Sequence, residues 1–321
     1  MRRAAGSVVV VLLAAACTAP QAPRTVPSAS PSPSASPSPS VTPSVPATPA
    51  PAVFDGARAL RTVQALATGV GPRDAASAAY RRAADLVERS FTAHGYSVRR
   101  QTVGVPAGRS GERDVPAGET VNVIATPPGY EPARPHLLVG AHLDTVPVSP
   151  GANDNASGIG VMLELARLAR LAPTRMPVVW VAFGGEERRV PGDAGALFGS
   201  RAYLDSMPRA QHAALKGVIV MDVVGRGTHV QIASDGKTAP PVIDALEATA
   251  MRLGIASRVR VLTGLFSDHR PFERAGFPVA WLYTGEFDEL HTRRDVAAIV
   301  DADALRRTGV VAWETLRTLS L

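Results

Sequence analysis

Five side chains that could bind a metal ion stand directly after apolar runs or within a glycine-rich loop. His142 follows "HLLVGA", Glu187 follows "VVWVAFGGE" and Asp222 follows "GVIVM". Asp154 lies in the loop "GANDNASG", and His291 follows a short acidic loop after "VAWLYTG". Imidazole nitrogens combined with carboxylate oxygens suit zinc or a similar divalent cation.

Each of these residues has a more ordinary explanation when it is taken singly. A histidine at the end of a strand is usually a hydrogen-bonded polar residue, and a Glu-Glu pair is usually solvated. Asp154 is either a turn-former or a ligand. Asp222 differs, because a carboxylate inside an apolar run is costly unless a cation or hydrogen bonds accompany it. Together the residues favour a metal site.

The elements that must position these residues alternate along the chain. Apolar runs predict strands at 120–129 (running into a turn), 136–144, 177–185, 217–225 and 277–285. Apolar residues at helical spacing predict helices at 57–69, 75–96, 158–172, 240–254 and 302–321. Strands that are apolar on both faces and separated by helices indicate an α/β sandwich with helices on both sides of the sheet. Ligand sites in such sheets form beyond the carboxyl ends of the strands, so several strands deliver these residues to one edge.

The combined motifs resemble one enzyme family. The stretches "AHLDT", "GANDNASG", "FGGEE", "MDVVG", "SDHRPF" and "HT" are similar, in order and spacing, to the co-catalytic zinc aminopeptidases of the aminopeptidase Y family, over roughly residues 55 to 320. The resemblance implies a three-layer sandwich of the zinc exopeptidase type, with a central mixed, mostly parallel β-sheet flanked by helices. It also implies two zinc ions per chain and the removal of N-terminal residues from peptides.

Residue roles follow from the same resemblance. The implied zinc ligands form two pairs and one bridging carboxylate: His142 with Asp222, Glu187 with His291, and Asp154. Glu186 is the implied general base, because a carboxylate that does not bind metal must take and return the proton of water. We expect Asp144 to accept a hydrogen bond from the imidazole of His142, and Asp295 to do the same for His291.

The sequence departs from the family pattern at two places. Leu290 stands where members often carry a tyrosine that stabilises the oxyanion, so that role is unassigned. The segment 188–198 is longer than usual, and it either shapes the substrate pocket or is a tolerated surface insertion.

The acidic residues Glu286, Asp288 and Glu289 either face the ammonium group of a peptide or form a solvated cluster.

Two other functions are compatible with parts of this pattern. Glutaminyl cyclases, which are single-zinc acyltransferases, resemble the family and carry a "DHxPF"-like segment, matched here by "DHRPF". A non-catalytic binding ectodomain on the same fold is the third reading. The complete ligand set and the "NDNASG" loop favour the hydrolase, and the presence of Glu186 argues against a purely binding role.

Composition limits the partners. The chain has 321 residues, of which 45% are hydrophobic, and its net charge is +6. Half of that charge comes from Arg2, Arg3 and Arg24, which precede the first acidic residue, Asp55. No long basic block follows, which argues against nucleic acid as a partner. We expect a monomer that acts on peptides.

The N-terminus indicates export. "MRR" precedes an apolar stretch of signal-peptide length that ends in "LAAAC", with the only cysteine of the chain at Cys17. This is similar to a bacterial lipoprotein signal over residues 1–17; an ordinary secretory signal is the alternative. Residues 18–52 are rich in proline and serine and predict a disordered tether to a peptidase domain at 53–321. The expected location is extracytoplasmic, with a lipid anchor in the cell membrane, or secreted.

The anchor hypothesis predicts the effect of Cys17→Ala. Without the thiol no lipid can be attached, so the variant should leave the membrane fraction for the medium or remain unprocessed. Fractionation and mass spectrometry of the mature N-terminus measure this. Unchanged fractionation, with no lipid on the parent protein, would favour the plain secretory signal.

Overall fold

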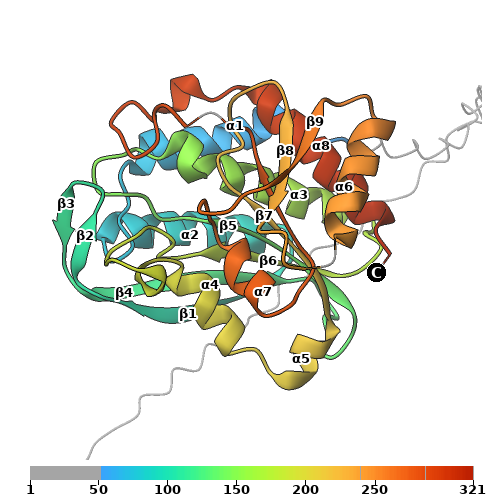
Figure 1. The fold of residues 1–321 in the computed structure, drawn as a ribbon, viewed down its shortest axis with the longest axis horizontal. Helices are drawn as coiled ribbons and strands as arrows, with labels where there is room; N and C mark the ends of the chain where they lie inside the picture. Colours follow the sequence, from blue (N-terminus) through green and yellow to red (C-terminus); the bar gives the residue numbers. More distant parts are fainter. Residues whose placement is uncertain (1–51, 239, 286, 321) are drawn as a thin grey trace, which may run out of the picture. The chain divides into compact units, whose positions relative to one another are not determined.

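An eight-stranded mixed sheet organises the described part of the chain (Figure 1). The structure is a computed structural model that describes residues 52–238, 240–285 and 287–320. The strands are β1 (Ser97–Val105), β4 (Gly118–Thr126), β5 (His136–His142), β6 (Val178–Phe183), β7 (Leu215–Met221), β8 (Val230–Ser234), β9 (Ser257–Val261) and β10 (Val279–Tyr283). Their order is β1-β4-β6-β5-β7-β10-β8-β9. A separate hairpin pairs β2 (Gly108–Ser110) with β3 (Arg113–Val115).

Strand directions confirm the expected mixed, mostly parallel sheet. The neighbours β6, β5, β7 and β10 run parallel to one another, and β8 runs parallel to β9. Strand β4 is antiparallel to both β1 and β6, and β8 is antiparallel to β10. The four central parallel strands therefore end at the same edge of the sheet, and the proposed site residues follow these ends.

Helices cover both faces, as a three-layer sandwich requires. One face carries α1 (Gly56–Gln64), α2 (Ala78–Ala93), α3 (Ser157–Leu171), α6 (Pro241–Arg252) and α8 (Ala302–Thr318). The other carries α4 (Phe198–Asp205) and α7 (His269–Arg274), with α5 (Arg209–Ala214) leading into β7. Short turns of π- or 3-10-helix occur at Ala65–Val70, Asp193–Gly195 and Ala297–Ile299, whereas the backbone of Ala152–Ala156 departs from helical angles at Asp154 and Asn155.

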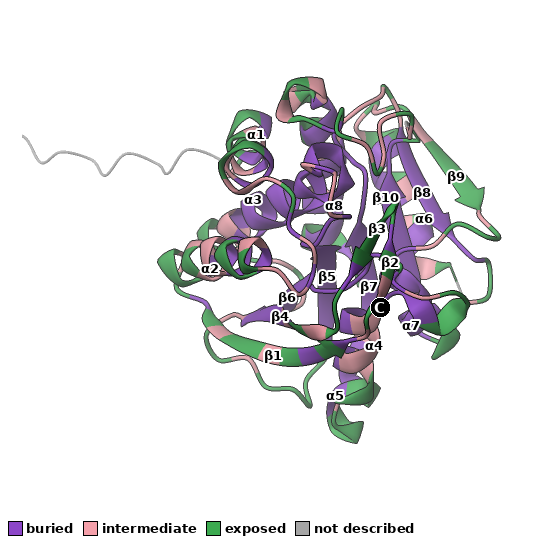
Figure 2. Cartoon of the chain, turned by 90° about the vertical axis from the view of Figure 1, so that its left-hand side faces the viewer, coloured by how far each residue is buried: buried purple, intermediate pink, exposed green. Residues whose placement is uncertain are grey.

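The apolar strands divide the core into two halves, because successive side chains of a strand point to opposite faces. In β6, Trp180 and Ala182 pack under the helices of the first face, whereas Val181 and Phe183 pack under those of the second. Every residue of β5, β6 and β10 is buried, so these strands read as continuous apolar runs. Figure 2 shows the central strands buried and β9 exposed at the edge of the sheet.

The elements expected from the sequence are present, and others were missed. Each expected helix and strand overlaps an observed one. The sequence analysis missed β1, the β2–β3 hairpin, β8, β9, α4, α5 and α7. Strand β9 is short and mostly exposed, with arginines between its valines, so it lacks the apolar signal of a buried strand. Helix α7 has only 6 residues, and its buried polar side chains hide the helical period.

Close packing of α1 on α3 supports the loop that precedes α3. Gly160 of α3 faces the carbonyl of Ala59 in α1, and a Cβ at position 160 would lie 2.6 Å from that oxygen. Because the obstructing atom belongs to the backbone, the two helices would have to separate.

The prediction compares two helical glycines. Gly160→Ala should lower the free energy of unfolding by about 1–3 kcal/mol through overpacking. Gly69→Ala, whose added Cβ meets nothing within 4 Å, should leave stability unchanged or raise it by up to about 1 kcal/mol through helix propensity. Chemical denaturation of both variants measures the difference. Equal stability of the two would contradict the tight α1–α3 contact.

Candidate metal centre

Two groups of potential ligand atoms lie at the carboxyl edge of the central strands, and they share one residue. The first group is His142, Asp154 and Asp222, and the second is Asp154, Glu187 and His291. In each group the potential ligand atoms lie within 4.8 Å of one another. The structure thus brings all five sequence-derived candidates together.

The shared carboxylate presents one oxygen to each histidine. Asp154 Oδ1 lies 3.1 Å from His142 Nε2, and Asp154 Oδ2 lies 3.2 Å from His291 Nε2. His142 Nε2 is also 3.2 Å from Asp222 Oδ1, and His291 Nε2 is 3.1 Å from Glu187 Oε2. Separations of this size fit ligand atoms about 2.0–2.2 Å from a common zinc ion. Asp154 is therefore positioned to bridge two cations.

The two asparagines of the "NDN" sequence fix the loop that carries Asp154. Asn155 Nδ2 donates to the carbonyl of Met221 (2.8 Å), and Asn153 Oδ1 accepts from the backbone N–H of Gly225 (2.8 Å). Both contacts tie the loop to the end of β7, which is followed by Asp222. Gly151 has a φ of 61°, and a Cβ there would lie 2.1 Å from Thr145 Cγ2. A larger residue at position 151 would push the loop away.

The backbone after Asp222 adopts an unfavourable conformation. Val223 has a φ of 58°, which is rare for a β-branched residue. Its carbonyl accepts hydrogen bonds from both the backbone N–H (3.0 Å) and the hydroxyl (2.9 Å) of Thr284. His291 also has a positive φ, of 58°. Strained residues cluster where the surroundings must fix a side chain, and both of these lie at the candidate centre.

Asp295 and the fully buried Arg73 support the loop from behind. The carboxylate of Asp295 accepts from the backbone N–H groups of Asn153 (2.7 Å) and Asp154 (3.0 Å). Arg73 donates to the carbonyls of Leu143 (2.6 Å), Pro150 (2.6 Å) and Gly151 (2.8 Å). The sequence analysis predicted a hydrogen bond between Asp295 and His291. The hydrogen bonds observed for Asp295 instead go to the backbone of the loop. Asp295 acts on Asp154 through the backbone.

Asp144 forms hydrogen bonds with residues at the ends of two neighbouring strands, β5 and β6. Its main-chain oxygen, rather than its carboxylate, accepts the hydrogen bond of His142 Nδ1 at 3.1 Å, which leaves Nε2 free to bind a metal. Its carboxylate accepts from the backbone N–H groups of Gly185 (2.9 Å), Glu186 (3.1 Å) and Glu187 (3.2 Å). Asp144 therefore sets the direction in which the Glu-Glu pair leaves β6.

The carboxylates of the centre carry negative charges that bound cations would balance. Glu187 and Asp154 raise the pKa of His291 to about 12. Burial opposes the charging of His142, yet Asp222 and Asp154 raise its pKa well above the usual value. Protons on the histidines would offset the carboxylates, and a divalent cation would compete with those protons. Glu187 Oε1 is buried without a hydrogen-bond partner, as expected for an oxygen reserved for a metal ligand bond.

Burial also shifts the pKa values of two acidic groups and one arginine near the centre. It raises the pKa of Glu186 well above its usual range and that of Asp268 to about 7. Asp268 is fully buried, and neither of its oxygens has a hydrogen-bond partner. Desolvation lowers the pKa of the Arg73 guanidinium to about 10. The motif "SDHRPF" had indicated this region, but nothing in the sequence around Arg73 indicated its role.

A cavity of about 340 Å³ adjoins the candidate ligands. Its described lining includes the carboxylates of Asp154, Glu186, Glu187 and Asp222, together with Arg188 and His291. The rest of the wall is apolar: Val223, Leu265, Phe266, Trp281, Phe287 and Leu290. Leu290, noted as a departure from the family pattern, contributes only apolar surface. A cavity with an apolar wall and converging polar groups is the usual form of a small-ligand site.

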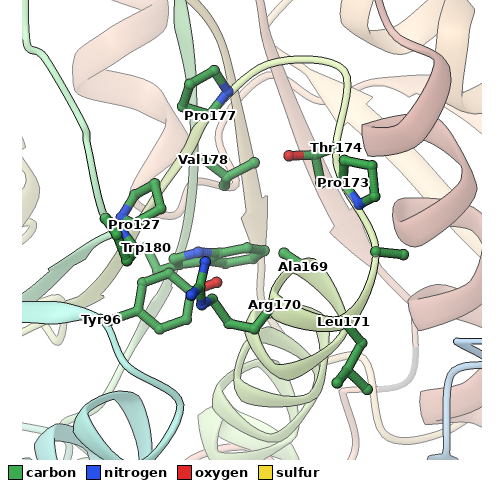
Figure 3. Close-up of a pocket in the computed structure, with 12 residues that line it drawn as sticks. Tyr96, Pro127, Ala169, Arg170, Leu171, Pro173, Thr174, Pro177, Val178 and Trp180 are labelled. Atoms are coloured by element: carbon green, nitrogen blue, oxygen red, sulfur yellow. The ribbon is translucent and has the colours of Figure 1, made fainter.

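A second hollow lies away from this centre. It has a volume of about 410 Å³, and Tyr96, Arg170, Pro177 and Trp180 are among its lining residues (Figure 3). Pro177 precedes the first residue of β6, so the hollow lies at the opposite edge of the sheet from Glu187. None of the described lining residues is a carboxylate or a histidine, so it offers no catalytic or zinc-binding group.

A third group of potential ligands is only partly engaged in protein contacts, because neither ring nitrogen of the buried His269 has a hydrogen-bond partner among the described residues. It consists of Asp235, His269 and Glu273. The oxygens of Glu273 accept from the backbone N–H groups of Asp235 (2.8 Å) and Lys237 (2.9 Å). Asp235 Oδ2 lies 3.2 Å from Arg270 Nε, which balances its charge. The two carboxylates thus belong to a buried network of hydrogen bonds and one ion pair at the start of α7, and His269 Nε2 lies 3.9 Å from Asp235 Oδ1.

The described acidic residues of the loop before His291 do not line the cavity, although apolar residues of the same loop do. Glu289 is ion-paired with Arg226, and Asp288 is exposed. Neither of them is among the described lining residues, whereas Phe287 and Leu290 are. Glu286 lies outside the described residues, as do Cys17 and the expected tether. The described acidic residues therefore fit the solvated-cluster interpretation better.

Comparison with known proteins places these observations in a family context. The sequence model of peptidase family M28 matches residues 122–316. Leupeptin-inactivating enzyme 1 of Streptomyces exfoliatus is 30% identical over 219 residues, covering 67% of this chain and 45% of the relative. Aminopeptidase YwaD of Bacillus subtilis is 31% identical over 183 residues, covering 54% and 38%. The probable lipoprotein aminopeptidase LpqL of Mycobacterium tuberculosis is 30% identical over 167 residues, covering 46% and 31%. The chain thus spans less than half the length of these relatives.

Solved structures share the fold. BSAP, a zinc aminopeptidase from Bacillus subtilis, superposes with a TM-score of 0.72 at 19% identity, covering 82% of this chain and 94% of that one. Porphyromonas gingivalis glutaminyl cyclase superposes with a TM-score of 0.69 at 29% identity, covering 82% and 98%. The first likeness, at such low identity, concerns the fold alone.

The shared carboxylate generates a prediction about metal binding. Asp154→Ala should weaken zinc binding at both groups, whereas Glu187→Ala should weaken it at one. Isothermal titration of chelator-treated protein with zinc measures both effects, and Asp288→Ala provides a control because that carboxylate lies outside the cavity wall. If Asp154→Ala bound zinc as the parent does, the bridging assignment would have to be dropped.

Proposed function

The chain belongs to peptidase family M28, and we propose that it is a zinc-dependent aminopeptidase that hydrolyses N-terminal residues from peptides. The observation that carries the proposal is the pair of ligand groups that share Asp154 beside a partly apolar cavity. The relatives named aminopeptidases support it.

Two zinc ions are proposed for this centre. His142 and Asp222 would hold one, Glu187 and His291 the other, and Asp154 would bind both. The donor set fits, since each group combines one imidazole nitrogen with two carboxylate oxygens. When bound, zinc polarises a substrate carbonyl and lowers the pKa of water.

Glu186 is proposed as the general base. It lines the cavity next to Glu187, and it is not a member of either ligand group. Asp144 holds its backbone N–H at 3.1 Å and so fixes where its carboxylate can reach. One carboxylate oxygen of Glu186 would take a proton from water and return it to the amine of the departing peptide. Burial raises the pKa of this carboxylate, whereas the positive charge of bound zinc would lower it, so that the group could both take and release the proton.

The cavity suits the end of a peptide chain. Glu186, the described lining carboxylate that belongs to neither ligand group, is available to a free α-ammonium group, and the apolar wall, including Phe266, Trp281 and Phe287, offers surface for the first side chain. We therefore propose that free N-termini bearing apolar residues bind here.

A glutaminyl cyclase is the second candidate. The 29% identity to the Porphyromonas gingivalis glutaminyl cyclase favours it, as does the "DHRPF" segment, whose Asp268 is buried and unpartnered. Peptides with N-terminal glutamine separate the two functions. A cyclase releases ammonia and leaves the peptide bond intact, whereas an aminopeptidase releases free glutamine.

Export and lipid anchoring are proposed from the N-terminal sequence. The lipoprotein description of LpqL supports this reading, although Cys17 lies outside the described residues. Among the described helices, none has both the length and the apolar character needed to cross a membrane.

The aminopeptidase proposal predicts that a free N-terminus is required. Peptides beginning with leucine should lose that residue, and their N-acetylated forms should not, because acetylation removes the ammonium charge. Mass spectrometry of the products gives the answer. Equal turnover of the two forms would leave an endopeptidase or amidase in place of an aminopeptidase.

The two adjacent glutamates should fail differently when each is changed to glutamine. Glu186→Gln should retain zinc but lose about 10²-fold or more in kcat, the range for a lost general base. Glu187→Gln should weaken zinc binding, so excess zinc should restore part of its activity. Steady-state kinetics at several zinc concentrations distinguish the two. Near-normal turnover of Glu186→Gln would remove the proposed base.

A further inference from the structure

One guanidinium group lines the cavity beside the carboxylates. Arg188 is exposed, and it directly follows the proposed ligand Glu187. Its Nη1 donates to the carbonyl of Gly192, and its Cζ lies 5.1 Å from the ring centre of Phe266. These two contacts hold one edge and one face of the guanidinium. They leave its other N–H groups available to a ligand, because no further hydrogen bond of Arg188 occurs among the described residues.

The neighbouring Arg270 shows what distinguishes Arg188. Arg270 also approaches Phe266, with Cζ 4.8 Å from the ring centre. However, Arg270 is buried, and its Nε lies 3.2 Å from Asp235 Oδ2. Its charge is therefore balanced within the protein. Arg188 forms no ion pair with any described carboxylate, and Asp193, on the same loop, is ion-paired with Arg274 at 2.8 Å.

The segment 188–198, longer than the family pattern, is fixed at its base. The backbone N–H groups of Leu197 and Phe198 donate to the carbonyls of Glu186 (3.0 Å) and Gly185 (2.8 Å), so the segment leaves and rejoins the strand end at one point. The next residue, Arg189, is buried, and its Nη1 donates to Asp74 Oδ2 at 2.8 Å.

Further contacts anchor the same residue. The guanidinium of Arg189 donates to the carbonyls of Pro106 (2.8 Å) and Pro116 (2.6 Å) on either side of the β2–β3 hairpin. The backbone N–H of Arg109, in β2, donates to the carbonyl of Arg189 at 2.7 Å. The segment is therefore anchored rather than loosely attached, and its first residue, Arg188, is presented to the cavity.

We propose that Arg188 binds a carboxylate of the substrate and makes this enzyme selective for peptides that carry such a group after the N-terminal residue. The inference rests on the proposed aminopeptidase function. A guanidinium matches a carboxylate with two parallel hydrogen bonds. The other charged lining residues are the proposed zinc ligands and Glu186, so Arg188 is the cationic side chain of the described wall that neither a proposed metal ion nor a described carboxylate engages. The carboxylate is either an acidic side chain after the N-terminal residue or the C-terminus of a short peptide.

The test uses two pairs of peptides on the zinc-loaded full chain. Leu-Gly-Gly is compared with its C-terminal amide, and Leu-Asp-Gly-amide with Leu-Asn-Gly-amide. The parent enzyme should favour the acid of one pair by about 10-fold in kcat/KM, the size expected for one charge-assisted contact. The pair that shows the preference identifies the source of the carboxylate.

Variants assign the preference to one residue. Arg188→Met should abolish it while cleavage of the neutral peptides persists, and Arg188→Lys, which keeps the charge without the planar fork, should retain part of it. Arg175→Met is the matched control, since this exposed arginine precedes β6 at the opposite edge of the sheet. The control should behave as the parent.

Two results would overturn the inference. One is a parent enzyme that cleaves both members of each pair equally, and the other is an Arg188→Met variant that keeps the preference. Either leaves the aminopeptidase function standing. Failure of the parent to cleave any of the four peptides would instead contradict the proposed function, and this inference with it.

Discussion

The carboxylate of Asp154, with one oxygen directed to each of two histidines, is the contact on which the candidate centre depends. His142 and His291 come from segments far apart in the sequence. The two carboxylate oxygens of Asp154 lie 3.1 Å from His142 Nε2 and 3.2 Å from His291 Nε2. Asp222 and Glu187 complete a strongly anionic cluster. Such a cluster is unfavourable in a buried place unless cations balance it, which is why the pKa values of both histidines are raised.

The loop that carries Asp154 is held mainly by contacts remote in sequence. Arg73 crosses from the segment before α2 to bind three carbonyls of residues 143–151. Asp295 binds the loop backbone from the other side, and Asn155 fastens it to β7. These groups orient the ligands without joining them, as supporting residues commonly do in metal sites.

Much of this arrangement could be predicted from the sequence, and the failures have physical causes. The central strands are apolar on both faces, so their positions and the edge at which they deliver His142, Glu187 and Asp222 could be predicted. Arg73 could not, because its partners are backbone carbonyls, which leave no trace in side-chain patterns. Asp295 was correctly singled out but given the wrong partner, since the hydrogen bond of a lone carboxylate depends on the tertiary structure. The role proposed for Arg188 likewise rests on contacts that the sequence does not show, namely the anchoring of Arg189 to Asp74 and the approach of Arg188 to Phe266.

Crystals grown with zinc provide the most direct test of the bridging role of Asp154. Anomalous differences measured at the zinc absorption edge locate the ions independently of any assay. The account predicts two peaks on either side of the Asp154 carboxylate, one contacting His142 and Asp222 and the other contacting Glu187 and His291. A single peak, or zinc bound only at Asp235 and His269, would contradict it.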